Sequence, residues 1–265
     1  MLMEPRAGRL AAWGNALLAG QAAPDDAAAR AVGDDTVHRV VGLPGESGPV
    51  GLTLALGRMR AEGVYGLRIA LPAPGHPLGL SGPPEFNAAA LAAGEAVLAS
   101  GAPLGLVPEV NEAGPAGDVL TEVLWRCLPV RQGPGADVPS LGEAERELAE
   151  VLRDSTEALA RLDVAGAGPV ARARLDAYRA RAERERQVLA PGYPARAVRV
   201  LELAQRVGAL VEIAAQPEGL APGATVSAGQ IAERDRLLRP VERAARRARV
   251  AAYNAYVETL ERQRG

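Results

Sequence analysis

The chain has 265 residues and a formal net charge of −2, and it contains thirty arginines but no lysine. Schiff-base chemistry on lysine and a phosphate-loop lysine are therefore excluded, and the single cysteine excludes an intramolecular disulfide and a multi-cysteine metal site. The net charge favours neither nucleic acid nor an anionic membrane, and no run of about 20 uncharged apolar residues could span a bilayer, so we expect a cytoplasmic protein without membrane association.

A helical hairpin is predicted over about residues 8–33. Leu10, Trp13 and Leu17 recur at helical spacing and would form one apolar face. A proline followed by two aspartates is a typical start for the second helix, and Gly33 is a typical end. We expect the hairpin to pack on a sheet or on the helices later in the chain.

Residues 36–130 alternate between strand and helix patterns. Apolar residues at helical spacing predict helices over 52–63 and 86–101. Short β-branched or apolar runs predict strands at 36–43, 67–71, 104–110 and, as either a fourth strand or a helical turn, 122–130. Strands and helices that alternate in this way are typical of βαβ units on a mainly parallel sheet. We therefore predict an α/β domain over residues 1–130, with the helical hairpin included.

A Gly/Pro-rich linker, residues 131–140, is predicted to separate this domain from a helical domain over 141–265. Pro240 lies inside the last helix and should kink or split it. Four amphipathic segments with short connections favour an antiparallel four-helix bundle, and they lie at 141–163, 170–190, 194–215 and 227–264. The predicted fold is thus an α/β layer domain followed by this bundle.

Candidate site residues lie in the loops that would follow the strands. In a parallel sheet the carboxyl ends of the strands share one edge, where ligands usually bind. His76 stands in a loop with five prolines and is the candidate acid or base. The candidate catalytic residues are His76, Glu85 and Glu109, and the candidate ligand-binding residues are Glu46, Ser47, Asn87, Asn111 and Glu112. A proline-rich loop of this kind equally suits a rigid surface cover whose histidine points to water.

The same residues decide which cofactor is expected. Carboxylates with one histidine suit Mg²⁺ or Mn²⁺ better than zinc, so an enzyme at this edge could require a divalent metal. No other cofactor is predicted, because the sequence matches neither a nucleotide-binding loop nor a serine-hydrolase elbow. His38 and Cys127 lie in apolar strand patterns and are expected to be buried structural residues.

Arginines on the last helix form a second candidate surface. They fall on adjoining turns and could contact nucleic acid or an acidic protein, and they are Arg239, Arg243, Arg246 and Arg247. No aromatic residue interleaves them for base stacking, and a solvated face with ion pairs one turn apart is the alternative. We therefore do not expect nucleic acid to be the main partner.

Three runs of the sequence resemble an uncharacterised family of actinobacterial proteins: residues 70–98, 104–110 and 239–254. The resemblance covers most of the chain. It implies a cytosolic protein. It also supports GC-rich codon usage as the reason why the chain contains no lysine. It implies no activity, cofactor or catalytic residue.

The sequence favours a non-catalytic interaction or regulatory protein. Few reactive side chains and a large, charged helical half without a catalytic signature support this hypothesis. We expect a protein partner or self-association. The first alternative is an enzyme or small-ligand binder that uses His76 and nearby carboxylates in the strand-end loops. The second is nucleic-acid binding through the arginine-rich last helix.

Overall fold

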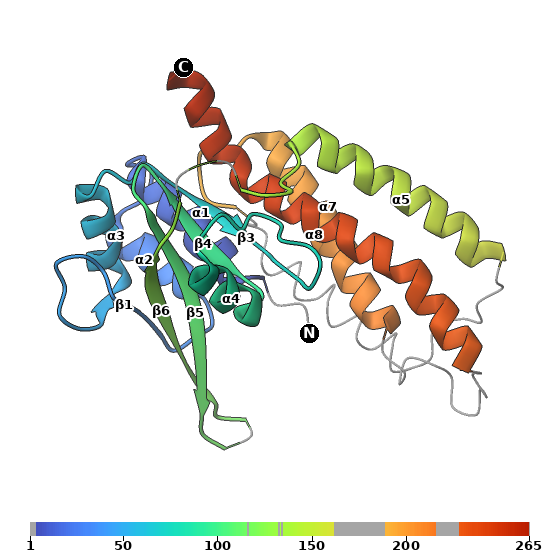
Figure 1. Ribbon diagram of the computed structural model, residues 1–265, viewed down its shortest axis with the longest axis horizontal. Helices are drawn as coiled ribbons and strands as arrows, with labels where there is room; N and C mark the ends of the chain where they lie inside the picture. Colours follow the sequence, from blue (N-terminus) through green and yellow to red (C-terminus); the bar gives the residue numbers. More distant parts are fainter. Residues whose placement is uncertain are drawn as a thin grey trace. The chain divides into compact units, whose positions relative to one another are not determined.

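The computed structural model describes residues 4–115, 117–131, 133, 135–161, 189–215 and 228–264 (Figure 1). These residues divide into two compact units. The α/β unit contains 4–138, 189–194 and 253–264, and the helical unit contains 139–161, 195–215 and 228–252. The boundary between Ala252 and Tyr253 falls inside the last helix, so this helix contributes residues to both units.

The helical hairpin predicted near the start of the chain is present. Helix α1 spans Arg6–Leu18 and α2 spans Pro24–Val32. Gly33 ends α2 with a positive φ of 62°, a conformation that glycine adopts without strain. No side chain of the preceding residue caps α1, and the Ala7 N–H instead donates to the Glu95 carboxylate at 2.8 Å. A carboxylate at a helix N-terminus is stabilising, so Glu95 fixes the start of α1 against the sheet.

A six-stranded mixed sheet lies at the centre of the α/β unit, in the order β2-β1-β6-β5-β4-β3. The strands are β1 (Val37–Val41), β2 (Val50–Gly51), β3 (Gly66–Ala70), β4 (Ala96–Ser100), β5 (Leu104–Ala113) and β6 (Leu120–Pro129). Strands β1 and β6 are parallel, and the other four described pairs are antiparallel. The mixed α/β composition is confirmed, and the run at 122–130 is a strand. The prediction of a mainly parallel sheet is wrong.

Two of the four antiparallel pairs come from the segment 86–101, which the sequence predicted as one helix. Helix α4 spans Pro84–Ala93 and ends at Gly94, whose φ of 74° is left-handed. Strand β4 begins two residues later and pairs antiparallel with both β3 and β5. Strands β3 and β5 therefore run in the same direction, as expected for a βαβ unit, but a third strand lies between them.

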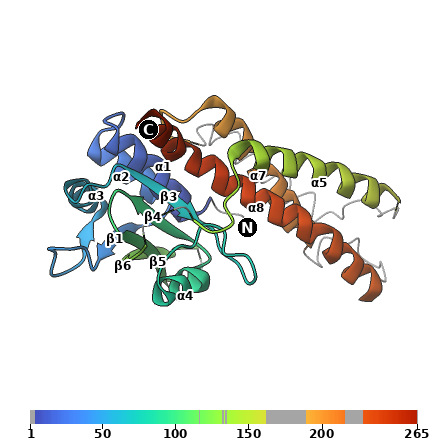
Figure 2. The same cartoon turned by 45° about the horizontal axis from the view of Figure 1, so that its top comes forward.

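Helices cover both faces of the sheet (Figure 2). On one face α1 packs on β3 and β4, and α3 (Leu52–Ala61) packs on β1 and β2. On the other face α4 packs on β5, where Phe86 joins Leu98 and Val107 in a buried apolar cluster. The ends of β5 and β6 extend past the other strands as a ribbon whose residues 109–113 are exposed (Figure 1).

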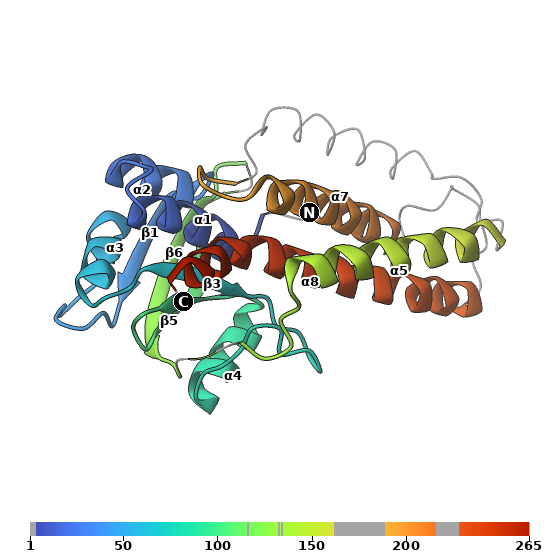
Figure 3. The same ribbon diagram turned by 90° about the horizontal axis from the view of Figure 1, so that it is seen from above.

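Three described helices build the helical unit: α5 (Leu141–Arg161), α7 (Ala195–Ala215) and α8 (Ala228–Arg264) up to residue 252. They run alongside one another in Figure 3. Arg196 of α7 pairs with Glu145 of α5 at 2.6 Å, and Arg247 of α8 pairs with Glu147 of α5 at 2.9 Å. Ion pairs thus connect α5 to both of the other helices.

Two predictions for the helical half have different outcomes. The helix predicted over 170–190 falls almost wholly outside the described residues, so the four-helix bundle stays a prediction. Pro240 lies within α8, which continues through it as one helix. The sequence predicted either a kink or a split at this proline, and α8 is not split there. No helix in the described ranges is long and apolar enough to cross a membrane.

Candidate functional site

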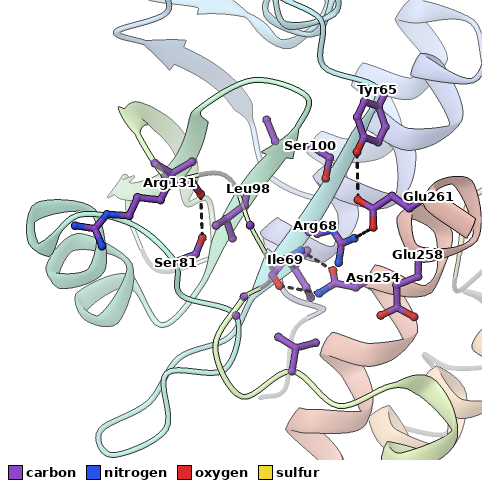
Figure 4. Close-up of a pocket in the computed structure, with 16 residues that line it drawn as sticks. Tyr65, Arg68, Ile69, Ser81, Leu98, Ser100, Arg131, Asn254, Glu258 and Glu261 are labelled. Atoms are coloured by element: carbon purple, nitrogen blue, oxygen red, sulfur yellow. Dashed lines mark hydrogen bonds and ion pairs between the residues drawn. The ribbon is translucent and has the colours of Figure 1, made fainter. Parts of the chain in front are cut away.

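The α/β unit contains a cavity of about 440 Å³ beside strands β3 and β4 (Figure 4). Its wall comes from these strands, from the segments 79–81 and 130–138, and from the last turns of α8. The buried side chains of Leu98 and Val130 are apolar parts of the wall. The polar parts include Tyr65, Arg68, Ser100, Asn254, Glu258 and Glu261. The volume lies in the range of known small-molecule pockets.

Two buried asparagines fix helices α1 and α8 to β3, which is the last strand in the sheet order. Asn254 accepts a hydrogen bond from the Ile69 N–H at 2.8 Å and donates to the Ile69 carbonyl at 3.1 Å. Asn15 does the same with Leu67, at 2.7 and 3.0 Å. Alternate residues of a strand turn their backbone groups to opposite sides. Both asparagines therefore form hydrogen bonds with the backbone N–H and carbonyl groups on the side of β3 that faces away from β4.

Tyr193 connects Asn15 to the backbone of α8 just before Asn254. Its hydroxyl accepts a hydrogen bond from Asn15 Nδ2 at 3.2 Å and donates to the Tyr253 carbonyl at 3.1 Å. Its ring lies 5.2 Å from that of Tyr256. Burial raises the pKa of Tyr193 well above its ordinary value, so the phenol keeps the proton it donates. The end of α8 is thus held in place by buried hydrogen bonds.

The end of α8 presents a row of polar side chains to the cavity. Asn254, Glu258 and Glu261 are spaced by four and three residues, so they lie on one side of the helix. The Arg68 guanidinium of β3 forms an ion pair with Glu261, and the Tyr65 hydroxyl donates to Glu261 Oε1 at 3.2 Å (Figure 4). Glu261 is therefore the acceptor for Tyr65, just before β3, and for Arg68 on β3.

Glu258 differs from Glu261 in its surroundings. Within the described part of the chain, its carboxylate has neither a hydrogen-bond donor nor an ion-pair partner within 4 Å. Burial raises the pKa of Glu258 above its ordinary value. The charges of Arg68 and Arg262 lower it in part, and Glu261 raises it further. The site therefore holds a half-buried carboxylate whose ionised form is disfavoured.

The segment predicted as a linker forms one wall of the cavity. The Gly79 N–H donates to the Ala136 carbonyl at 2.8 Å, and the Ala136 N–H donates to the Leu80 carbonyl at 3.1 Å. Gly79 has a φ of 99°, and a Cβ there would lie 2.9 Å from Ala70, so no other residue fits without a shift. These bonds join the proline-rich loop to the segment that follows β6. The Arg131 guanidinium points away from the carboxylates of α8 in Figure 4.

The structure does not gather the residues predicted for the strand-end site into one place. Strand β1 runs opposite to β3 and β5, so the residues that follow it lie at the other edge of the sheet. Glu46 and Ser47 follow β1. His76, Glu85 and Asn87 follow β3, whereas Glu109, Asn111 and Glu112 lie on the exposed half of β5. Glu46 and Ser47 therefore do not lie at the end of the sheet from which the loop after β3 emerges, as the prediction of one strand-end site requires.

Several of these residues have partners of their own. Glu46 accepts from Arg58 at 2.6 Å, and Glu109 accepts from Arg126 at 3.1 Å. Asn87 Oδ1 accepts from the Gly82 N–H at 3.2 Å and closes the turn before α4. No three His, Cys, Asp or Glu side chains of the described ranges converge so that they could hold a metal ion. Catalysis by His76, Glu85 and Glu109 stays a prediction.

A second buried polar cluster lies under the helical hairpin and has a structural role. Asp35 accepts two hydrogen bonds from Arg6, at 2.9 and 2.8 Å, and one from Arg9 at 2.6 Å. His38 Nε2 lies 2.9 Å from Asp35, and Trp125 Nε1 donates to His38 Nδ1 at 3.3 Å. Since both imidazole nitrogens are engaged, His38 has no nitrogen left for a substrate. The expectation that His38 is a buried structural residue is confirmed.

The arginines predicted as a partner surface differ in exposure. Arg239 and Arg243 are exposed, whereas Arg246 and Arg247 are half-buried. Arg247 pairs with Glu147, and Arg246 lies 3.4 Å from Glu242 one turn earlier. Two of the four guanidinium groups are thus engaged within the helical unit.

The cavity residues of α8 were missed in the sequence, although one signal was present. Carboxylates and an amide at positions 254, 258 and 261 share a helix face that also carries apolar residues. Arg68, the ion-pair partner of Glu261, interrupts the apolar strand LRIAL. The ion pair between them joins residues 193 positions apart. Nothing local in the sequence indicates such a pairing.

Comparison with known proteins finds one family for both halves of the chain. Residues 7–139 match the model described as "Rv1486c-like protein, N-terminal domain", and residues 142–250 match "Rv1486c-like protein, C-terminal domain". The chain is 35% identical over 282 aligned positions to "Uncharacterized protein Rv1486c" of Mycobacterium tuberculosis, and 31% identical over 292 to "Uncharacterized protein ML1804" of Mycobacterium leprae. Each alignment covers 94% of this chain and 96% of the relative. No solved structure matches.

Proposed function

Because the chain belongs to the Rv1486c-like family over both of its halves, as its resemblance to an uncharacterised actinobacterial family indicated, we propose a function from its own geometry. The protein is a non-catalytic regulatory protein that binds a small ligand in the cavity of the α/β unit. The observation that carries this proposal is a cavity of about 440 Å³ with buried apolar walls and one unpaired carboxylate. Such a combination is typical of small-molecule sites.

The composition of the cavity wall supports binding rather than catalysis. Ser81 and Ser100 supply hydroxyl groups, but a serine nucleophile needs a base beside it. Neither histidine is among the described residues that line the cavity, and His38 is already enclosed by Asp35 and Trp125. The proposal therefore assigns the hydroxyls to hydrogen bonding with a ligand.

Helix α8 supports the regulatory part of the proposal. Asn254, Glu258 and Glu261 line the cavity from its last turns, while its residues 228–252 belong to the helical unit. A ligand that orders these turns would stabilise a helix that both units share. The helical unit would then bind a partner in a way that depends on the ligand. A four-helix bundle remains our proposal for its architecture.

The test is a comparison of two valine-to-tryptophan variants. Val138→Trp would fill the cavity from the segment 130–138, whereas Val110→Trp would place the same side chain on the exposed ribbon. Thermal shift and native mass spectrometry with a panel of small metabolites should show ligands that stabilise the wild type and Val110→Trp. For Val138→Trp we expect at least a tenfold loss of affinity. Equal responses from both variants, or no stabilising metabolite at all, would contradict the proposal.

The exposed ribbon favours self-association as a second function. Val110, Val119 and Leu120 are 42%, 48% and 57% exposed near the end of β5 and the start of β6. Apolar side chains on an exposed two-stranded ribbon are better stabilised when another surface covers them. Sedimentation of the wild type should show concentration-dependent dimers that Leu120→Asp removes. Leu54→Asp, at a leucine of α3 with 48% exposure, should keep them; a wild type that is monomeric throughout would exclude this function.

A further inference from the structure

The charges that line the cavity leave one carboxylate uncompensated. Arg68 is a single positive charge beside two carboxylates, and its guanidinium is already bonded to Glu261. Tyr65 also directs its hydroxyl to Glu261 rather than to Glu258. Arg131, the other arginine of the wall, points away from both carboxylates in Figure 4. Glu258 is therefore the carboxylate of the cavity wall that a ligand could still pair with.

Ionised Glu258 is unfavourable without a ligand. Burial raises the pKa of this carboxyl, and the neighbouring charge of Glu261 on the same helix adds to the effect. Arg68 on β3 and Arg262 on the following turn of α8 offset it in part. A cation placed against Glu258 would remove this penalty, because an opposite charge in a partly desolvated site stabilises the ionised form.

Anionic and neutral ligands fit the same wall less well. An anion that pairs with Arg68 would have to displace Glu261 and would then lie close to Glu258. A neutral ligand would leave the half-buried carboxylate without a counter-charge while shielding it further from water, and desolvating an unpaired charge is costly. We infer that the cavity binds a small organic cation, an amine whose ammonium group pairs with Glu258 and whose hydrocarbon part lies against Leu98 and Val130.

The remaining wall agrees with an ammonium ion that has a short apolar body. Leu98 and Val130 are buried and offer only methyl groups, whereas the Ser100 hydroxyl can accept a hydrogen bond from a second ammonium hydrogen. A cavity of about 440 Å³ accommodates a ligand of metabolite size. This inference rests on the proposed function, since it names the ligand class of the same cavity.

The test uses matched sets of ligands that share a carbon skeleton and differ in the charge of the head group. Aliphatic and aromatic amines, from n-butylamine to phenethylamine, are compared with the alcohols and carboxylates of the same carbon skeletons. Binding is measured at pH 8 by ¹H–¹⁵N chemical-shift titration of the full-length protein. The variants are Glu258→Gln and, as a matched control, Glu62→Gln at an exposed glutamate that follows α3.

We expect amines to bind at least tenfold more tightly than their alcohols, and carboxylates to bind more weakly still. Glu258→Gln should reduce the affinity for amines at least tenfold without changing that for alcohols, and Glu62→Gln should change neither. Amines that bind no better than alcohols, or that bind Glu258→Gln as well as the wild type, would overturn the inference but leave a binding cavity. If no ligand of any charge shifts the resonances of the cavity wall, the proposed function fails as well.

Discussion

Asn254 forms hydrogen bonds with both backbone polar groups of Ile69, accepting from its N–H at 2.8 Å and donating to its carbonyl at 3.1 Å. An amide side chain presents a donor and an acceptor side by side, as a neighbouring strand does. Strand β3 lies at the end of the sheet order, where unpaired backbone groups would otherwise remain. Asn254, with Asn15 at Leu67, thus takes the place of a seventh strand.

Replacing Asn254 should therefore destabilise the α/β unit strongly. Asn254→Leu removes both bonds and leaves the N–H and carbonyl of Ile69 buried without partners, at about 2–4 kcal/mol. Hydrogen exchange of the Ile69 amide should become faster in the variant, and thermal denaturation should start at a lower temperature. Asn111→Leu, on the exposed part of β5, should stay within about 0.5 kcal/mol of the wild type. Unchanged exchange at Ile69 would show that the amide pair is not stabilising.

Asp35 should make the stability of the α/β unit sensitive to acid. Burial alone would raise its pKa, but hydrogen bonds from Arg6 and His38 and the charges of Arg6 and Arg9 bring it below the ordinary value of 3.8. A lowered pKa contributes stability above the unfolded-state value, and this stability is lost as the pH falls through the folded-state value. The melting temperature of the wild type should therefore decrease below about pH 4.

The variant Asp35→Asn tests this acid dependence. It leaves two arginines around a neutral side chain that is nearly inaccessible, so we expect a loss of about 3–5 kcal/mol at pH 7. Its melting temperature should change less than that of the wild type between pH 5 and pH 3. The exposed Asp118→Asn should behave like the wild type at every pH. Parallel pH profiles for Asp35→Asn and the wild type would disprove the assignment.

The fold could be predicted from the sequence where local patterns decide the structure. The hairpin, α3 and the strands at 37–41, 66–70 and 104–113 follow from apolar spacing and from glycine and proline signals. Strand β4 was missed because AVLAS follows an alanine-rich helix, and a short apolar run has no periodicity that separates helix from strand. Gly94, with its left-handed φ, was the local signal for the end of that helix.

The cavity could not be predicted, because contacts between distant residues create it. Strand direction depends on pairing, and β1 runs opposite to β3 and β5, so the loops that follow these strands emerge at opposite ends of the sheet. The chain then returns to the α/β unit at Tyr253, so that Asn254 and Glu261 meet β3. The local signal in the sequence lies instead at residues such as His76 in its proline-rich loop. His76 itself does not line the cavity, although Gly79 and Ser81 of the same loop do.

Cys127 should be unreactive in the folded protein. It lies on β6 and is 8% exposed, and burial raises its pKa to about 11. Since the thiolate is the nucleophile, almost none is present at pH 8. Iodoacetamide should leave the native protein unmodified for hours at pH 8 and should modify it fully in denaturant, as intact-mass spectrometry can measure. Rapid labelling of the native protein would mean that β6 opens readily.

Glu258→Gln should stabilise the ligand-free protein, and only when Glu258 would be ionised. The folded-state pKa of Glu258 is raised above its ordinary value of 4.5 by burial. Such a group contributes stability that is fully present below its unfolded-state pKa and is lost as the pH rises through the folded-state value. The melting temperatures of the variant and the wild type should therefore agree near pH 4, and the variant should melt higher at pH 8. Glu62→Gln should match the wild type at both pH values, whereas a Glu258→Gln protein that melts lower at pH 8 would show that its carboxylate is already paired.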